Sequence, residues 1–453
     1  MVAELVYKYN LPGPRYTSYP TVPNWNVGDF SLDEWKKNVK WQFQQSNDSK
    51  GMAIYIHLPF CESLCTFCAC HKHITKRHEQ ELPYLEAVVK EWEMYVNLFS
   101  SEKGNKPVLR ELHLGGGTPT FFSPKNLSYL LQAIYSHVEL SEDFEGSFEG
   151  HPDSTTQEHL QTLAQLGFKR LSIGVQDYNE KVQLAINRMQ SFEQVQQVHD
   201  WAKEAGYQSI SQDLVYGLPF QTYQDLQFTL QQTLQLRPER IAFYSYAHVP
   251  WIKGLGQRGF DENDLPEPSI KLQMLIYGRE QLLQAGYVEI GMDHFALPTD
   301  SMALALENGT LHRNFMGYTI ANTPMMIGLG MSSISDTWTA FGQNEKNLKT
   351  YMELIEKGEF PIVKGHVLSQ EDLVIRKNIL DLMCQFELTQ FHYNMINKSQ
   401  QPMFEELLKD GMILVQNNQL MVTEKGRNFV RNVAMTIDPY LNIIKQNQFS
   451  KTI

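Results

Sequence analysis

Four of the five cysteines of this chain lie in one ten-residue stretch, as Cys61, Cys65, Cys68 and Cys70. Clustered thiolates in an otherwise cysteine-poor chain indicate a soft metal ion or an iron–sulfur cluster. The spacing allows either a C-x3-C-x2-C set with one additional thiol or a set of four thiolates. A cluster held by only three cysteines leaves one iron with an open coordination position, where a small molecule can bind.

A structural zinc site is the alternative for these cysteines. Four thiolates can close a tetrahedral zinc site, and His71 or His73 can substitute for one of them. Zinc sites usually pair two C-x2-C knuckles across a longer loop, whereas these cysteines leave little slack for a tetrahedron. The spacing favours the iron–sulfur interpretation, and a zinc-stabilised interaction protein stays open as the competing hypothesis.

The whole chain has the composition of a soluble enzyme of two or three domains. It has 453 residues, 42% of them hydrophobic and 20% charged, and a formal net charge of −12. The acidic balance argues against a nucleic-acid partner. We find no secretory signal at the N-terminus and no apolar stretch long enough for a membrane span. Five cysteines, four of them clustered, are typical of a reducing cytoplasm.

Six short apolar runs alternate with helix-like segments between residues 53 and 248. Several of the helices end in glycine, as at Gly167 and Gly206. Consecutive βα units form a parallel sheet, so the pattern predicts an α/β fold built on an incomplete (β/α)6 barrel. A doubly wound open sheet is the alternative. The predicted strands are 53–57, 109–114, 146–150, 170–174, 209–215 and 240–245.

Polar and glycine-rich motifs follow these strands, and barrels concentrate their active sites at the carboxyl ends of strands. Three adjacent glycines at 115–117 let a backbone approach a ligand closely. The alternative is that they only form a tight turn and have no ligand. Four polar side chains would surround the opening of the barrel at this end, where they could bind an amino acid carboxylate and a ribose. They are Glu149, Gln176, Arg188 and Asp213.

We expect three parts along the chain: an N-terminal arm and helix at 1–49, a catalytic domain at 50–365 and a C-terminal domain at 366–453. The arm at 14–20 is rich in proline and aromatic residues and predicts an extended packing segment. The C-terminal part predicts helices and a hairpin in a winged-helix-like arrangement. Because the chain is acidic, we expect a lid or interaction domain there, with Cys384 as a core thiol.

Taken together, the motifs resemble those of the oxygen-independent coproporphyrinogen III oxidases, which are radical S-adenosylmethionine enzymes of heme biosynthesis. The resemblance covers nearly the whole chain. C-x3-C-x2-C alone gives only the radical S-adenosylmethionine superfamily, and the combination of motifs is far more specific. The matching stretches are 13–20, 61–70, 115–120, 171–177, 216–219, 246–248, 291–296, 311–315 and 448–450.

The resemblance implies a radical S-adenosylmethionine barrel in which Cys61, Cys65 and Cys68 ligate a [4Fe–4S] cluster. Cys70 is then not a ligand, although it distinguishes the oxidases from related heme-binding chaperones, which typically carry phenylalanine there. Two molecules of S-adenosylmethionine are implied. The positions matching those that hold the first are Tyr55, Phe67, Gly116, Glu149, Gln176, Arg188 and Asp213. The positions matching those that line the second are Gly117, Thr118, Ala247 and Ile334.

The implied reaction converts two propionates of coproporphyrinogen III into vinyl groups, giving protoporphyrinogen IX. A 5′-deoxyadenosyl radical would abstract hydrogen from the propionate β-carbon before carbon dioxide leaves. We expect a monomer that takes electrons from a one-electron donor such as a flavodoxin or ferredoxin. In the family the N-terminal arm is linked to substrate engagement. A heme-binding chaperone on the same fold is the alternative function.

An acidic protein needs local cations to bind a polycarboxylate substrate. We predict that these are Arg15, His294, His312 and Arg313. The chain also departs from the family pattern, with Ala69 and His71 around the last cysteine where glycine and asparagine are usual. Residues 150–151 are Gly-His where Val-Asp is expected. None of these departures removes a predicted ligand.

Overall fold

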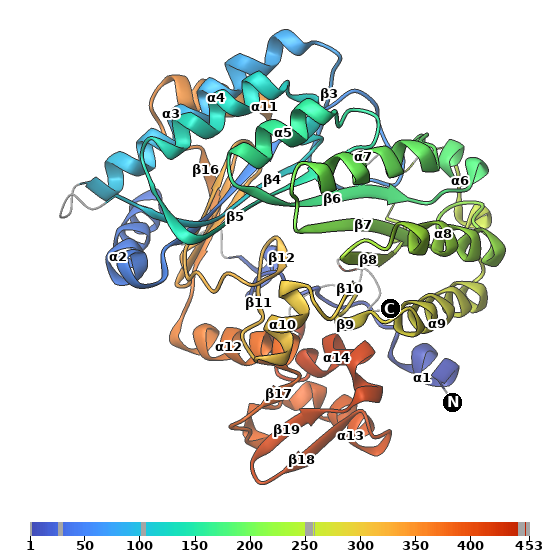
Figure 1. Ribbon diagram of the computed structural model, residues 1–453. Helices are drawn as coiled ribbons and strands as arrows, with labels where there is room; N and C mark the ends of the chain where they lie inside the picture. Colours follow the sequence, from blue (N-terminus) through green and yellow to red (C-terminus); the bar gives the residue numbers. More distant parts are fainter. Residues whose placement is uncertain are drawn as a thin grey trace.

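The computed structural model describes residues 2–25, 30–100, 106–249, 257, 259–442 and 449. Of the predicted 448–450 motif, only Phe449 lies within the described residues. A twelve-stranded mixed sheet forms the centre of the molecule (Figure 1). Six of its strands are parallel neighbours in chain order, and all six overlap the predicted runs. They are β1 (Met52–Leu58), β4 (Val108–Gly116), β5 (Glu139–Gly150), β6 (Phe168–Gln176), β7 (Ser209–Tyr216) and β8 (Arg240–Ser245).

The sheet continues beyond these six strands on both sides. β13 pairs with β1 in parallel, and the other added strands are antiparallel. Within the described residues the outermost strands, β16 and β9, do not pair with each other, so the sheet stays open. The added strands are β9 (Val288–Gly291), β10 (His294–Ala296), β13 (Met326–Leu329), β14 (Ile334–Asp336), β15 (Ala340–Asn344) and β16 (Ile362–Val367).

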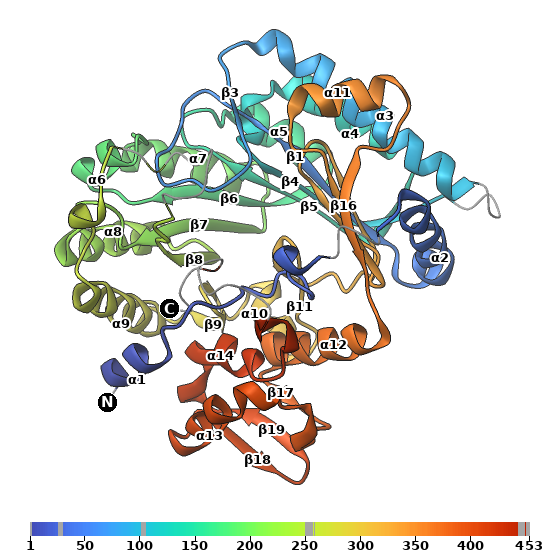
Figure 2. The same cartoon turned by 180° about the vertical axis from the view of Figure 1, so that it is seen from behind.

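Helices follow the strands and contact one another in chain order, from α3 to α4, α5, α7, α8 and α9. Figures 1 and 2 show them along one side of the sheet. One-sided cover is typical of a barrel wall and not of a doubly wound sheet. Capping boxes begin α5, α7 and α8 at Thr156, Ser191 and Thr222. These helices are α3 (Glu81–Ser100), α4 (Pro124–Tyr135), α5 (Gln157–Gln165), α6 (Glu180–Ala185), α7 (Phe192–Glu204), α8 (Tyr223–Leu236) and α9 (Pro268–Gln284).

The principal core lies between this sheet and its helices. Strand residues such as Leu112, Phe148 and Ile173 are fully buried there against helix residues such as Leu130 and Leu160. Apolar burial of this extent is the main force that holds the strands in register. No helix among the described residues is long and apolar enough to cross a membrane.

A second core joins the two ends of the chain. It contains Leu5 and Val6 of α1 (Val2–Tyr9) together with buried residues of the C-terminal helices, including Cys384. The sequence did not predict α1. Beyond residue 366 the predicted helices and hairpin are present, and the hairpin turns at Asn417 and Asn418, both with positive φ. The second core contains residues from all three predicted parts of the chain. The three-part division therefore stays a prediction.

The remaining elements complete the fold. They are α2 (Leu32–Lys50), β2 (Phe60–Cys61), β3 (His73–Ile74), α10 (Ser301–Glu307), β11 (His312–Asn314), β12 (Gly317–Thr319), α11 (Leu348–Glu356), α12 (Gln370–Gln385), β17 (Glu387–Leu388), α13 (Gln401–Lys409), β18 (Ile413–Gln416), β19 (Gln419–Val422) and α14 (Val430–Met435). The predicted helix at 424–435 begins as a 3-10 turn before α14.

Candidate active site

The cysteine loop leaves the carboxyl end of β1 and returns through β3, which pairs in parallel with β2. The far side of the loop is fixed to the end of α6. There Thr66 donates through its amide to the Ile186 carbonyl at 2.9 Å, and Asn187 donates to the Leu64 carbonyl at 2.8 Å. Phe67 packs against an apolar cluster that includes Val182 and Tyr246. The loop is thus held by the barrel end on two sides.

Each of the three predicted ligand sulfurs accepts a hydrogen bond from a neighbouring residue. Thr118 Oγ1 donates to Cys61 Sγ at 3.2 Å, Arg188 Nη1 to Cys65 Sγ at 3.7 Å and the Cys70 amide to Cys68 Sγ at 3.4 Å. Hydrogen-bonded, partly exposed thiols on one loop fit an iron–sulfur cluster, since donors to the sulfurs tune such clusters. Among the described residues, no three His, Cys, Asp or Glu side chains gather as a single-ion site.

The thiols differ in their acidity. A hydrogen bond from Cys70 lowers the pKa of Cys68 to about 6, whereas burial raises the pKa of Cys61 to about 11. Thiolates are the form that binds metal, so metal binding at Cys61 is coupled to the loss of its proton. Cys70 itself is exposed.

The glycines at the end of β4 have a structural explanation as well as the predicted ligand role. Gly116 has φ +110°, and a Cβ there would lie 2.5 Å from the His57 ring. A Cβ on Gly117 would lie 2.5 Å from the Pro59 backbone. These glycines let β4 approach the start of the cysteine loop closely. The Gly116 amide donates to Glu149 Oε2 at 3.2 Å, which places that carboxylate at the same strand end.

Aromatic and imidazole side chains of β1 and β4 lie beside these glycines. Tyr55 lies parallel to the His113 ring at 6.0 Å, and its hydroxyl lies 3.0 Å from Nδ1 of His57. The other ring nitrogen of His57 lies 2.8 Å from the carbonyl of His71 in the cysteine loop. Burial lowers the pKa of His57 to about 4, so this ring is neutral near pH 7. The contact of this neutral ring with the His71 carbonyl ties the cysteine loop to β1.

The residues of the predicted polar ring lie at the ends of β5 and β6, within β7 and just after α6. Burial and the nearby charge of Glu149 raise the pKa of Asp213 to about 7. Burial would also raise the pKa of Glu149, but hydrogen bonding and the charge of His113 hold it below its usual value. Gln176 is buried with φ 70°, and Arg188 donates to the Gly174 carbonyl as well as to Cys65. Acceptors and one guanidinium therefore meet beside the cysteine loop.

A cavity of about 780 Å³ opens at the same edge of the sheet, past the ends of β7 and β8. Its lining includes Tyr246, which also packs near Phe67, and Ala247, a residue predicted for the second cosubstrate. Lys271 donates to the Tyr246 carbonyl at 2.7 Å in its wall. The N-terminal arm and α14 close the side of the cavity away from the sheet. Its volume is in the range of small-molecule sites.

Two arginines hold the N-terminal arm beside this cavity. Arg431 of α14 donates to the carbonyls of Gly13 and Pro14, and Arg313 of β11 donates to those of Arg15 and Tyr16 at 2.7 and 2.6 Å. Four consecutive carbonyls of the arm are thus bound by two guanidinium groups. The arm is a packing segment, as predicted, and it presents the Arg15 side chain to Asp293 in the cavity wall.

The charge around Arg15 is predominantly positive. Burial and the repulsion of Arg15 lower the pKa of Arg431 to about 9, and Arg313 contributes to the same effect. Although burial alone would raise it, Arg15 holds the pKa of Asp293 below its usual value. Among the described residues, three guanidinium groups therefore lie near Asp293, with Glu262 as a second carboxylate in the cavity wall. This excess of cations favours binding of further anionic groups.

Of the four predicted substrate cations, the structure brings three together. His294 lies near Arg15 and Arg313, with its Nε2 3.4 Å from the Tyr244 hydroxyl. His312 lies elsewhere, near Arg376 and Asp336. Burial lowers the pKa of both histidines to about 4, so neither is a cation near pH 7 unless a carboxylate joins it. Their substrate role stays a prediction.

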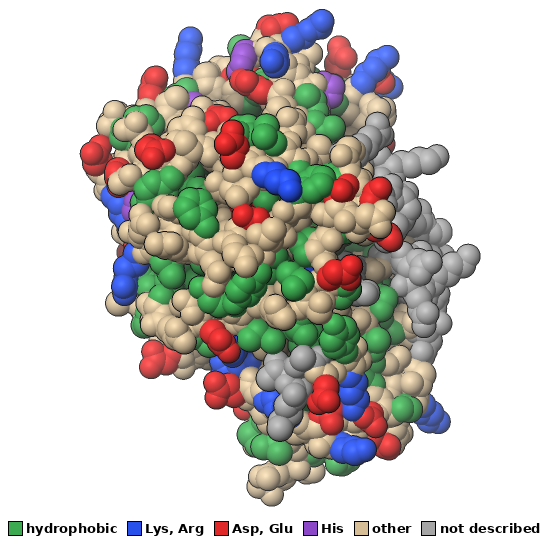
Figure 3. Space-filling model, turned by 90° about the vertical axis from the view of Figure 1, so that its right-hand side faces the viewer, with side chains coloured by type: hydrophobic (Ala, Val, Ile, Leu, Met, Phe, Trp, Pro, Cys, Tyr) green, Lys and Arg blue, Asp and Glu red, His purple; other side chains and the backbone are tan. Residues whose placement is uncertain are grey.

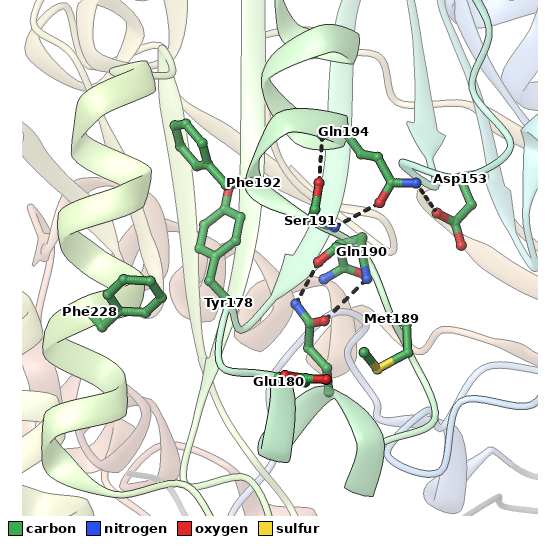
Figure 4. A pocket seen from close by; sticks show the side chains of 10 residues that line it. Asp153, Tyr178, Glu180, Met189, Gln190, Ser191, Phe192, Gln194 and Phe228 are labelled. Atoms are coloured by element: carbon green, nitrogen blue, oxygen red, sulfur yellow. Dashed lines mark hydrogen bonds between the residues drawn. The ribbon is translucent and has the colours of Figure 1, made fainter.

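The other predicted residues are spread around this end of the sheet. Ile334 of β14 is buried beside Trp25 and Phe341, and its role toward a second cosubstrate also stays a prediction. A separate depression of about 610 Å³ lies on the outer side, between the ends of α6, α7 and α8 (Figure 4). Gln194 and Asp153 are hydrogen-bonded at 3.1 Å across its rim, and none of the predicted site residues lines it.

The fold and the site define a radical S-adenosylmethionine enzyme. The sequence profile of the radical SAM superfamily matches residues 55–232. The chain is 38% identical to the oxygen-independent coproporphyrinogen III oxidase of Pseudomonas aeruginosa, covering all of this chain and 98% of that protein. It is 36% identical to the same oxidase of Escherichia coli, covering 99% and 98% of the two chains.

A solved structure agrees with these relatives. The structure described as coproporphyrinogen III oxidase from Escherichia coli, a radical SAM enzyme, superimposes with a TM-score of 0.87 at 34% identity, covering 97% of this chain and 98% of that one. This chain belongs to the family of oxygen-independent coproporphyrinogen III oxidases. The family membership confirms the resemblance that the motifs indicated and implies an iron–sulfur cluster and S-adenosylmethionine in place of zinc.

The sequence did not reveal three residues of this region. Arg431 lies in a C-terminal helix more than four hundred residues from the carbonyls that it binds, and no local pattern marks it. Lys271 occupies an ordinary position within α9. Asp293 lies inside the matching stretch 291–296, and a carboxylate directly before His294 was the one available signal.

Proposed function

We propose that this protein decarboxylates coproporphyrinogen III oxidatively, converting two propionates into vinyl groups and giving protoporphyrinogen IX, with S-adenosylmethionine as cosubstrate. The observation that carries the proposal is the cationic cavity beside the cysteine loop, in a chain related along its full length to such oxidases. A porphyrinogen with four carboxylates needs a cavity of this kind, since buried carboxylates require cationic partners.

Cys61, Cys65 and Cys68 are the residues that would hold a [4Fe–4S] cluster. In this superfamily such a cluster supplies the electron that cleaves S-adenosylmethionine. Glu149, Asp213 and Arg188 would bind the ribose and amino acid groups of the cosubstrate, because acceptors pair with hydroxyls and ammonium and a guanidinium pairs with a carboxylate. Asp213 and Glu149 resist simultaneous ionisation, and a cationic ligand relieves that repulsion.

Arg15 is the cavity residue best placed to bind a substrate propionate. It is held to Asp293 in this structure, and a propionate would compete with that carboxylate for the guanidinium. The arm over the cavity would also exclude water from the reacting carbon, which protects a radical reaction from side reactions. The protein would position the substrate and exclude water, and the cofactors would supply the radical chemistry.

We further propose two bound molecules of S-adenosylmethionine, a monomeric enzyme and a reducing, cytoplasmic location. Thr118 contacts Cys61 and Ala247 lines the cavity, which supports a second molecule between the cysteine loop and the substrate. Equilibrium dialysis of S-adenosylmethionine against reconstituted protein tests the number. Two equivalents per chain are expected, and a plateau at one equivalent would contradict this part.

The test of the function is anaerobic purification with iron and sulfide analysis, followed by a coproporphyrinogen assay with S-adenosylmethionine and a chemical reductant. About four irons and four sulfides per chain are expected for a [4Fe–4S] cluster, together with porphyrinogen turnover that depends on S-adenosylmethionine. A colourless protein with bound zinc would refute the proposal, as would tight heme binding without decarboxylation.

A further inference from the structure

A basic surface segment follows the cysteine loop directly. Residues 71–78 read His-Lys-His-Ile-Thr-Lys-Arg-His, with three Lys or Arg, three His and no acid, in a chain of net charge −12. His73, Lys76 and Arg77 are exposed. Figure 3 shows Lys, Arg and His side chains along the upper edge of the face, where Figure 1 places β3, with carboxylates among them. A local excess of positive charge on an acidic protein requires an explanation.

The segment is joined to the cysteine loop through its backbone. Thr75 donates through its amide to the Cys61 carbonyl at 2.9 Å, and Ile74 is the strand partner of Cys61. Lys72 donates to the carbonyls of Cys68 and Cys70 at 3.1 and 3.4 Å. A protein that touched this segment would therefore lie beside the predicted cluster ligands.

The charges of the segment are largely available for a partner. The acidic neighbours are Glu62, 3.6 Å from His78, then Glu81, 2.6 Å from His78, and the exposed Glu79. Within the part of the chain that the structure describes, no ion pair engages the side chains of Lys76 and Arg77. Burial and the nearby charge of Lys346 lower the pKa of His71, so Lys346 adds to the positive field around the segment.

Apolar side chains are exposed around the same loop. Ile74 of β3 is 42% exposed, Leu64 of the loop 36% and Leu184 of α6 62%. Leu64 and the end of α6 are joined by the hydrogen bond from Asn187. Exposed apolar groups with a charged rim are the composition of protein docking sites, and electron-transfer encounters use small ones.

We propose that residues 71–78, with Leu64 and Leu184, form the docking surface for a small acidic protein that carries one electron on a flavin or an iron–sulfur group. This inference rests on the proposed function, which requires one-electron reduction. In the proposed electron transfer, the reduced donor loses one electron and the enzyme gains one electron at the predicted cluster site beside Cys61. No covalent bond forms between the two proteins. Complementary charge steers the encounter and raises its rate.

The test compares Lys76→Glu/Arg77→Glu with the wild-type enzyme, using reduced flavodoxin and, separately, dithionite as electron source. The dithionite-driven rate should be unchanged, because a small reductant needs no docking surface. The flavodoxin concentration for half-maximal rate should rise about tenfold to a hundredfold at low salt, and the difference should shrink at high salt. The dissociation constant of oxidised flavodoxin for the cluster-free protein, measured by flavin fluorescence, should rise in parallel.

The matched control is Lys398→Glu/Lys409→Glu, an equal charge change on exposed lysines just before α13 and at its last residue. Figure 1 shows α13 at the opposite end of the molecule from β3. It should leave both rates and the dissociation constant near those of the wild type. Equal weakening by both double variants, or no weakening by Lys76→Glu/Arg77→Glu, would overturn the proposal, as would loss of the dithionite-driven rate in that variant. Tighter binding of RNA than of flavodoxin would overturn it in favour of a nucleic-acid partner. A wild-type enzyme inactive with dithionite would instead refute the proposed function.

Discussion

The cysteine side and the arginine side of the candidate site are built in opposite ways. The cysteine side comes from one short loop whose residues are close in sequence, at Cys61, Cys65 and Cys68. The arginine side joins the N-terminal arm to Asp293, Arg313 and Arg431, each of which lies hundreds of residues along the chain from the arm. A local motif carries its chemistry in its spacing, whereas a distributed one depends on the whole fold. Substitutions should therefore remove the chemistry on one side and substrate affinity on the other.

The largest effect is expected for Cys65→Ser. Loss of one predicted ligand should remove the iron and lower activity by about a thousandfold or more, or about 4 kcal/mol at the usual conversion. Iron analysis and the anaerobic assay measure this. Cys384→Ala is the control, since that thiol is buried in the second core and should leave iron content intact. Full iron in the Cys65 variant would contradict the assignment.

On the arginine side, Arg431→Lys should raise KM for coproporphyrinogen by about a hundredfold. A lysine cannot bind two carbonyls in the fixed fork geometry, and two charge-assisted hydrogen bonds are worth about 3 kcal/mol together. Iron content and substrate-independent cleavage of S-adenosylmethionine should not change. Arg427→Lys, in the turn before α14, is the control with the same chemical change. Loss of iron from the Arg431 variant would show that cluster binding also depends on the arginine side, contrary to this account.

A smaller effect is expected for Arg15→Gln, because the arm stays anchored through its backbone carbonyls. Loss of one guanidinium–carboxylate contact should raise KM by about tenfold, with kcat and S-adenosylmethionine cleavage nearly intact. Steady-state kinetics separate the two parameters. An unchanged KM would remove Arg15 from the substrate site.

The smallest expected effect concerns pH and Asp213. Its pKa of about 7 in the folded protein lies above the unfolded value of about 3.9. The folded state therefore holds this proton more tightly, and its contribution to stability is lost as pH rises toward 7. Asp213→Asn should remove about 1 kcal/mol of this pH dependence from the cluster-free protein. Denaturant unfolding at pH 5.5 and pH 6.5 measures it; an equal change in the free energy of unfolding between these two pH values in both proteins would contradict the raised pKa.

The sequence predicted the fold and the cysteine side because both depend on local patterns. Short apolar runs located the six parallel strands, and the 3.6-residue period and capping residues located helices between them. The strands β13 to β16 and the helix α1 were not predicted, because they are short or depend on partners elsewhere in the chain. Arg431 escaped for the same reason, since its role arises from the carbonyls of Gly13 and Pro14 across the molecule.

The glycines at the end of β4 show how one sequence feature can have two explanations. Their position at a strand end indicated a ligand, yet Gly116 and Gly117 also admit His57 and Pro59. A sequence pattern cannot distinguish a backbone that must approach a ligand from one that must approach a neighbouring strand, because both require the absence of a Cβ.

The most direct measurement is carbon dioxide release per porphyrinogen in an oxygen-free reaction with S-adenosylmethionine and dithionite, run beside Cys65→Ser. Conversion of two propionates to vinyl groups predicts two carbon dioxide molecules for each coproporphyrinogen III consumed, with none from the variant. Porphyrinogen bound without carbon dioxide, or equal release from the variant, would contradict the account.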